Sequence, residues 1–272
     1  MATKEKVRSQ YQTIQIEALR RSAMKVIVVG DSPLIVNAWS QKAKQEMLFK
    51  HMGVKLEHGN KDPYEDFVRS MYRFDDGHYG FPVVAFKEAM ATVTADLPDA
   101  TKAAVYRNIT VAGRRGFSVA AFADLLSPHD LAEIFSPNAP QIREDMVKTA
   151  GIARTPDIRY RAEFWPWAAR FTLGFNARLF TAESVLNLIA QAGFSVGIAE
   201  WRQEKGGSNG LFHAAQPEEI AQVAKWKKAG PKEPPFIDSR KWLAEALEGL
   251  PTKERKPARK PKGGNGSHET VL

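Results

Sequence analysis

Residues 165–176, WPWAARFTLGFN, constrain the fold most, because apolar and polar positions alternate over residues 170–175. Phe171, Leu173 and Phe175 are apolar, and they alternate with Arg170, Thr172 and Gly174. Side chains on a β-strand point alternately to the two faces of a sheet, so this pattern predicts a strand with one buried face. We therefore expect a sheet that is covered on one side.

The next segment predicts a helix followed by a loop and a strand. Thr181 can cap a helix and Gly193 can end it. The apolar stripe of this helix consists of Val185, Leu186, Leu188, Ile189 and Ala192. The loop EWRQEKGGSNG (200–210) then leads into a short strand, GLFHA (210–214).

The rest of the chain predicts one further buried strand and several helices. The run MKVIVVGD (24–31) is β-branched and reads as a strand. We expect helices over 37–53, 80–93 with Pro82 in the first turn, 217–230 and 238–250. Residues 54–79 are polar and rich in turn residues, so we expect an excursion from the core, and residues 106–136 predict short strands.

Composition narrows the class of protein. A chain of 272 residues with 43% hydrophobic residues can bury a core, and the absence of cysteine excludes disulfides and thiolate metal sites. No apolar run is long enough to span a membrane, and the N-terminal segment lacks the apolar core of a secretory signal, so we expect a cytoplasmic protein. The net charge of +8 favours a polyanionic partner.

Much of the positive charge lies at the C-terminus. Residues 251–272, PTKERKPARKPKGGNGSHETVL, are rich in Lys, Arg, Pro and Gly and predict a disordered basic tail. The tail serves either solubility or the electrostatic capture of nucleic acid, and charge pattern alone leaves both interpretations open.

Two segments of the expected folded domain carry basic side chains suited to nucleic acid. Residues 141–164 hold five basic residues, and the alternation around Arg159 and Arg161 predicts a strand with one cationic face. In the loop, Trp201 can stack on a base, and glycines can let a phosphate approach main-chain N–H groups. The alternative is that Trp201 belongs to the core and the loop is a plain connection.

Signals for catalysis are weak. The chain contains no phosphate-binding, dinucleotide, HExxH or GxSxG motif, and its six histidines lack ligand spacing. Asp75, Asp76 and His78 form the most enzyme-like cluster, but Asp and Gly are also typical of a turn. We therefore expect a turn there, no catalytic residues, no metal and no cofactor.

The order of segments resembles the RAMP superfamily, the RNA-binding proteins of CRISPR effector complexes, and is most similar to their backbone subunits. Phe81, Pro82, Phe86, Lys87 and Ala89 match the segment that opens the first helix in that family. The loop glycines match the family's glycine-rich loop. The chain also resembles phage and prophage proteins that share strings such as GFPVVAFK and GFSVGIAEW.

The resemblance implies an α+β fold: a modified ferredoxin-like (RRM-like) antiparallel sheet with helices on one face. We expect an N-terminal extension (1–23), a nucleic-acid-binding domain (24–215) with insertions at 31–80 and 137–163, a helical extension (216–250) and the tail (251–272). The candidate nucleic-acid-binding residues are the basic, aromatic and glycine positions Lys87, Arg114, Arg115, Arg143, Lys148, Arg154, Arg159, Arg161, Arg170, Trp201, Arg202, Lys205, Gly206, Gly207 and Gly210.

The expected function is binding of single-stranded RNA or DNA without much sequence preference, with copies assembling along the strand and no membrane partner. One alternative is a phage protein that anneals single-stranded DNA, and another is a structural phage protein. A RAMP-type nuclease is disfavoured because no His, Tyr and Lys set stands out in the sequence.

Overall fold

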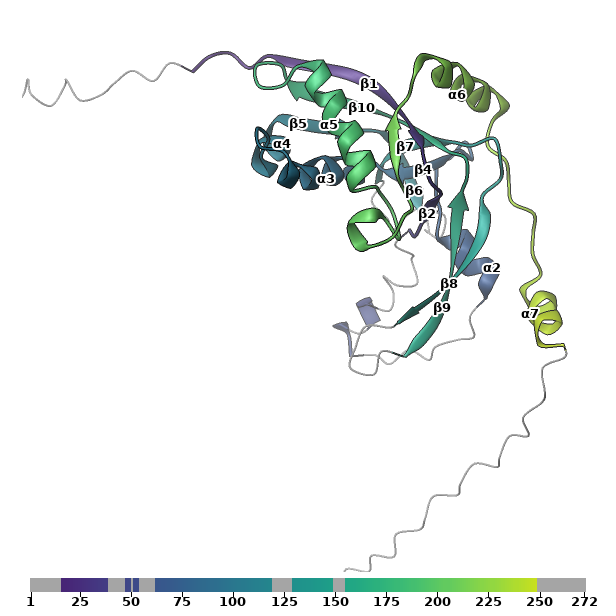
Figure 1. Cartoon of the computed structure of the whole chain (residues 1–272). Coiled ribbons are helices and arrows are strands. Elements are labelled where there is room, and N and C mark those ends of the chain that lie inside the picture. The colour runs from purple at the N-terminus through teal and green to yellow at the C-terminus, as the bar shows by residue number, and fades with distance from the viewer. Residues whose placement is uncertain are drawn as a thin grey trace, which may run out of the picture. The chain divides into compact units, whose positions relative to one another are not determined.

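The computed structural model describes residues 16–38, 47–49, 51–53, 62–118, 129–148 and 155–248 (Figure 1). The chain divides into two compact units, Met1–Phe236 and Ile237–Leu272. All described strands lie in the first unit. The second unit contains helix α7 (Ser239–Leu247), which begins where the Asp238 side chain accepts hydrogen bonds from the amides of Arg240 and Lys241.

Four strands and two helices of the first unit form a ferredoxin-like core. In chain order these are β1 (Arg21–Gly30), α3 (Val84–Val93), β5 (Ile109–Ala112), β10 (Ala168–Asn176), α5 (Ala182–Ser195) and β11 (Phe212–Ala214). The strands lie in the order β11-β1-β10-β5, and every neighbouring pair is antiparallel. This β-α-β-β-α-β arrangement confirms the expected α+β fold with an antiparallel sheet.

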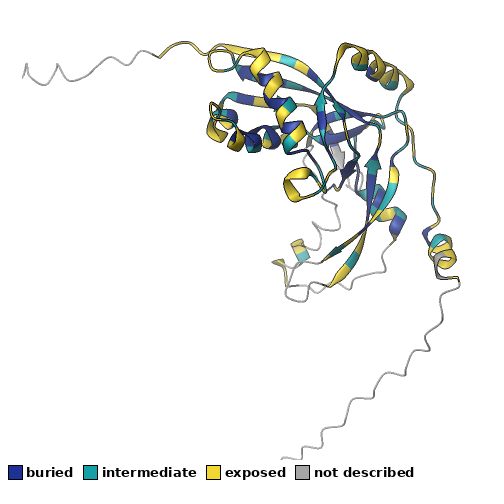
Figure 2. Ribbon diagram, viewed as in Figure 1, coloured by how far each residue is buried: buried dark blue, intermediate teal, exposed yellow. Residues whose placement is uncertain are grey.

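The helices α3 and α5 cover one face of this sheet through a core of aromatic side chains. Phe171, Leu173 and Phe175 of β10 are all buried, as their alternation predicts. The ring of Phe86 on α3 stacks on Phe171 with a centroid distance of 4.4 Å and meets Phe212 edge-on at 5.5 Å. Figure 2 shows the resulting division of both helices into a buried inner side and an exposed outer side.

Helix α5 departs from its prediction at its C-terminal end. Thr181 caps it as expected, by accepting a hydrogen bond from the amide of Ser184. The expected end at Gly193 is wrong, because the helix continues to Ser195. A Cβ at position 193 would lie 1.9 Å from the carbonyl oxygen of Phe212, so this glycine lets α5 approach β11 closely. Leu186 is 38% exposed and lies outside the buried stripe.

The sheet extends beyond the ferredoxin-like core because two different strands pair with the same edge of β10. Residues 172–175 pair with β5, whereas residues 168–170 pair with β7 (His129–Phe135). Beyond β7 lie β4 (Tyr79–Pro82), β3 (Tyr72–Arg73) and β6 (Arg114–Ser118), and β6 also pairs with β7.

This extension corrects two predictions. Residues 62–79 are not an excursion from the core, because they form α2 (Pro63–Arg69) and β3, with Phe67, Met71 and Phe74 buried. Residues 54–61 lie outside the described residues, as does most of the helix expected over 37–53. Pro82 ends β4 and does not lie in the first turn of α3.

A second, three-stranded sheet has the order β2-β9-β8. Its strands are β2 (Leu34–Val36), β8 (Gln141–Lys148) and β9 (Pro156–Phe164), so the insertion expected over 137–163 is an antiparallel hairpin with its connection outside the described residues. Ser70, at the end of α2, links this helix to the three-stranded sheet. Its hydroxyl accepts a hydrogen bond from the amide of Ala162 on β9 at 2.8 Å. Its carbonyl accepts a hydrogen bond from the amide of Ala38 at 2.8 Å.

Helices α4 (Lys102–Asn108) and α6 (Pro217–Ala229) also belong to the first unit. Helix α4 is capped by Thr101, which accepts the amide of Ala104. Helix α6 packs against the other face of the large sheet, where Val223 joins a cluster with Phe135 and Ala168. No helix within the described ranges is long and apolar enough to cross a membrane.

Candidate nucleic-acid interface

The face of the sheet opposite α3 and α5, which we call the open face, contains a cleft of about 440 Å³. Strand register brings its residues together, because directly paired residues of antiparallel strands lie on the same face. Lys25 pairs with Thr172, and Arg170 pairs with Glu133. The cleft is lined by Lys25, Ala112, Gly113, Arg114, Glu133, Arg170, Phe171, Thr172 and Lys227. Four of these nine residues are basic and one is acidic, so the cleft has a positive excess.

Two of the four cations are already paired. Arg170 donates from Nε to Glu133 at 2.8 Å and also donates from Nη2 to the same carboxylate. Arg114 donates to Asp76 at 2.6 Å, and its guanidinium lies 4.5 Å from the ring centroid of Phe74. Burial by itself would raise the pKa of Asp76, but the hydrogen bonds from Arg114 and His78 and the charge of His78 together outweigh it and lower the pKa to about 2. These pairs hold the two guanidinium groups in place at the cleft.

The other two cations, Lys25 and Lys227, carry the unbalanced charge. Lys25 is exposed on β1 and Lys227 is exposed on α6. Neither ammonium group has an ion-pair partner among the residues that the structure describes. Both side chains are therefore available to an anionic ligand in the cleft.

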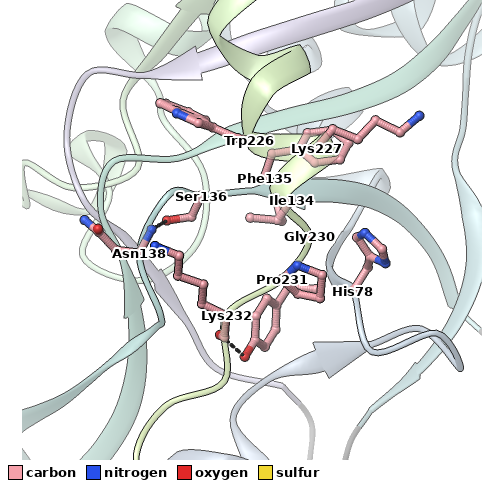
Figure 3. Close-up of a pocket in the computed structure, with 11 residues that line it drawn as sticks. His78, Ile134, Phe135, Ser136, Asn138, Trp226, Lys227, Gly230, Pro231 and Lys232 are labelled. Carbon is pink, nitrogen blue, oxygen red and sulfur yellow. Dashed lines mark hydrogen bonds between the residues drawn. The ribbon is translucent and has the colours of Figure 1, made fainter.

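The segment around α6 fixes the position of Lys227. Trp226 packs against the Phe135 cluster, and Figure 3 shows Trp226 and Lys227 leaving α6 in different directions. After the helix, the hydroxyl of Tyr79 donates to the carbonyl of Lys232 at 3.0 Å. Burial raises the pKa of Tyr79 to about 12, although nearby positive charge opposes the shift, so the hydroxyl remains a donor.

An ion pair strengthens the same attachment. Arg73 on β3 donates to both carboxylate oxygens of Glu233, at 2.7 and 2.6 Å. A bidentate pair of this kind is stronger and more directional than a single contact. It ties the segment after α6 to β3 of the large sheet.

The glycine loop has a different construction from the one expected. The amides of Gly206, Gly207 and Gly210 donate to the carbonyls of Gln203, Arg202 and Pro33, at 2.9, 3.1 and 2.8 Å. These N–H groups are therefore not available to a phosphate, which corrects the role predicted for the glycines.

Close packing and turn geometry explain the loop glycines instead. A Cβ at position 207 would lie 1.8 Å from the carbonyl oxygen of Trp201, and one at position 210 would lie 1.8 Å from that of Ile198. Gly206 has a φ of +78°, which favours glycine. The loop thus folds tightly on its own backbone.

Trp201 lies in this loop with its side chain outside the core. It is 43% exposed and has a φ of +55°, a conformation that is uncommon for residues with a side chain. Arg202 and Lys205 both pair with Glu204, at 2.8 and 3.0 Å, and these contacts lower the pKa of Glu204. The loop therefore presents an exposed indole but no excess of positive charge, because Glu200 and Glu204 balance Arg202 and Lys205.

The predicted cationic face of the β8–β9 hairpin is wrong. Register places three arginines and three carboxylates on the same face, namely Arg143, Arg159, Arg161, Asp145, Asp157 and Glu163. Arg143 pairs with Asp145 at 3.0 Å and with Glu163 at 2.7 Å. The partner strand thus supplies the acids that balance the basic residues.

Burial further distinguishes the two arginines of β9. Arg161 is only 3% exposed and lies 3.4 Å from Asp145 and 3.7 Å from Glu200. Arg159 is exposed, as is Lys148 at the end of β8, and Arg154 lies outside the described residues. Arg161 is thus a structural residue of this hairpin.

The remaining sequence-predicted residues lie apart from one another. Lys87 on α3 donates to the carbonyl of Tyr106 at 3.1 Å, and Arg115 on β6 is exposed opposite Asp130. Of the predicted basic residues that the structure describes, only Arg114 and Arg170 line the cleft. Lys25 and Lys227 were missed; the one available signal was that Lys25 is the single charged residue inside the apolar run MKVIVV.

The Asp75–His78 segment forms the turn of the β3–β4 hairpin, as predicted. The amide of Gly77 donates a hydrogen bond to the backbone carbonyl of Phe74 at 2.9 Å. The amide of Phe74 donates to the backbone carbonyl of His78 at 2.8 Å. Gly77 has a φ of +82°, and Asp76 is held by Arg114. Over the described ranges, no group of three His, Cys, Asp or Glu residues is arranged to hold a metal ion.

The chain has a distant structural likeness to a solved protein. No protein-family model matches the sequence, and no curated protein matches it. A solved structure that is similar is Cmr6 from Pyrococcus furiosus, with 13% sequence identity and a TM-score of 0.32. The match covers 73% of this chain and 100% of Cmr6. A likeness at this level says nothing about function.

Proposed function

We propose that the chain binds single-stranded nucleic acid in the cleft on the open face, as a binding protein and not as an enzyme. The observation that carries this proposal is the charge of the cleft, where four basic residues surround one carboxylate and two lysines have no described ion-pair partner. Phosphate groups are the anions that such an arrangement of cations favours along a strand. The resemblance to the RAMP superfamily supports RNA as the first ligand to test and DNA as the second.

The lining of the cleft favours contact with the sugar–phosphate backbone over stacking on bases. Its single aromatic residue, Phe171, is 3% exposed and packs towards α3. The hydroxyl of Thr172 and the cations offer hydrogen bonds to phosphate oxygens, which carry no sequence information. We therefore propose binding that is largely independent of sequence.

The first prediction concerns Lys227. We expect Lys227→Ala to weaken binding of single-stranded RNA and to reduce the slope of log affinity against log salt by about 0.7, the value for one lost phosphate contact on a single strand. Titration of a labelled oligonucleotide at two or more salt concentrations, followed by fluorescence anisotropy, measures both quantities. Lys25→Ala should behave in the same way.

Lys225→Ala provides the matched control. Lys225 is exposed on the same helix and carries the same charge, but it does not line the cleft. It should leave the salt slope close to that of the unchanged protein. If only deletion of residues 251–272 weakens binding, while the Lys25 and Lys227 variants bind normally, the site on the open face is wrong.

A further inference from the structure

Strand β1 has one complete edge and one largely open edge. Along the first edge, residues 21–29 all pair with β10. Along the second, β11 pairs only with residues 28–30. Within the described residues, positions 21–26 have no strand partner on this outer edge, and Arg21, Ser22, Ala23 and Lys25 are exposed. An unpaired edge of this length is a template for another strand.

Hydrogen bonds at the two ends of β1 reveal which backbone groups point outward. The carbonyl of Ile27 accepts the amide of Ala215, on the β11 side, whereas the carbonyl of Arg20 accepts the amide of Ala177, on the β10 side. Backbone groups alternate along an antiparallel strand, so odd-numbered residues of β1 face the outer edge. Arg21, Ala23 and Lys25 therefore direct both N–H and C=O towards the open side.

The segment before β1 continues in the same line and exposes apolar side chains. Arg178 forms an ion pair with Glu17 and donates to the carbonyl of Ala18, which supports the segment on the β10 side. Ile16 is 90% exposed and Leu19 is 64% exposed. In Figure 1 this segment runs on past the end of β10, so its outer edge is uncovered.

We propose that the occupant of this edge is a second copy of the chain, paired antiparallel through β1 and the segment before it. A two-fold axis near Leu19 sets Leu19 against the same residue of the other copy and Glu17 opposite Arg21. Opposite charges that face each other across strands are favourable. Pairing centred on Arg20 or Arg21 would instead set a pair of arginines against each other.

This register keeps the pairing within the open edge. Among the described residues it lays residues 16–22 of each copy along the same residues of the other, and it ends before Ile27, whose carbonyl is already bonded to Ala215. Antiparallel pairing of two edge strands continues the sheet across both copies, so the two open faces lie on the same side. The inference does not depend on the proposed function.

The absence of cysteine gives a clean test by cross-linking. In Leu19→Cys the two introduced thiols would face each other across the axis, and mild oxidation should yield a covalent dimer on a non-reducing gel. Leu179→Cys is the control, because Leu179 is equally exposed, at 64%, but lies outside the pairing segment. Equal cross-linking of both variants would overturn the proposal.

Sedimentation of the full chain without nucleic acid provides the second test. The unchanged protein should be a dimer and Ala23→Pro a monomer, because proline removes an N–H that points outward and leaves the β10 ladder intact. Arg21→Glu should also dissociate the dimer, and Glu17→Arg combined with Arg21→Glu should restore it. A monomeric unchanged protein would refute the pairing, whatever the outcome of the nucleic-acid titrations.

Discussion

Arg159 and Arg161 lie two positions apart on β9, but they have different surroundings. Arg159 is exposed, whereas Arg161 is buried between Asp145 on β8 and Glu200 at the start of the glycine loop. Both arginines lie on the same face of β9, as the alternation in the sequence predicts. Alternation indicates the face on which a side chain lies, but it does not indicate what covers that face. Acids that lie 16 residues before and 39 residues after Arg161 in the chain decide the difference.

This difference predicts opposite results from two alanine variants. Arg161→Ala should lower the free energy of unfolding by about 3 kcal/mol, because it leaves Asp145 buried with one partner fewer. Arg159→Ala should change it by less than about 0.5 kcal/mol, as is usual for an exposed residue. Urea denaturation followed by circular dichroism measures both.

Arg161→Met serves as a further control, since it removes the charge but keeps most of the volume. It should resemble Arg161→Ala if the ion pairs stabilise the hairpin, and should be milder if packing of the side chain matters more. Unfolding midpoints that are equal for Arg161→Ala and the unchanged protein would contradict a structural role for this arginine.

At the scale of elements, His213 fastens helix α6 to the sheet. Its Nδ1 lies 2.7 Å from Asp31 at the end of β1, and its Nε2 lies 2.9 Å from Glu219 in the first turn of α6. Glu219 also accepts the amide of Gln216 at 2.7 Å, which completes the cap of the helix. Protonated histidine can donate from both ring nitrogens, so the two carboxylates favour that form.

The attachment of α6 should therefore weaken as pH rises. Partial burial by itself would lower the pKa of His213, but the hydrogen bonds to Glu219 and Asp31 outweigh it and raise the pKa. The folded protein then binds this proton more tightly than the unfolded chain does. The stabilisation is complete below the unfolded pKa of about 6.5 and is lost as pH rises through the higher folded value.

Hydrogen exchange of the α6 amides at a series of pH values, corrected for the intrinsic rate, measures this dependence. Protection should fall over that range in the unchanged protein and should lose this dependence in His213→Gln. The same profile in both proteins would show that another group controls the attachment of α6.

At the scale of the whole molecule, local patterns predicted single strands and helices of the core, and the family resemblance implied their ferredoxin-like arrangement. Neither predicted how the sheet extends beyond that core. The pattern at Phe171, Leu173 and Phe175 and the cap at Thr181 depend on neighbouring residues, so local periodicity was sufficient. Strands β3 and β4 have two and four residues, too few for a period to appear, and they are held by pairing with distant segments. The three-stranded sheet is likewise built from segments more than 100 residues apart.

The candidate site was missed in part for the same reason. The cleft takes residues from β1, β5, β6, β7, β10 and α6, and no single stretch of sequence contains two of its unpaired cations. The basic segments that stood out, around Arg161 and Lys205, carry their own acids, which pairing and loop closure bring into contact. A local excess of basic residues therefore did not identify the surface with unbalanced charge.

Pairing of two copies through β1 would join two such clefts on one side of a continuous sheet. The affinity of the protein for long strands then depends on both the proposed nucleic-acid site and the proposed pairing. An oligonucleotide that reaches only one cleft should bind the unchanged protein and Ala23→Pro equally well. One long enough to reach both should bind the unchanged protein more tightly, by roughly 100-fold, because the second contact is made at a high effective concentration. Longer strands also offer more binding positions, but this advantage is the same for both proteins and cancels in the comparison. Anisotropy titrations over a series of lengths at one salt concentration would reveal the threshold, and identical length dependence in the two proteins would mean that the clefts act separately.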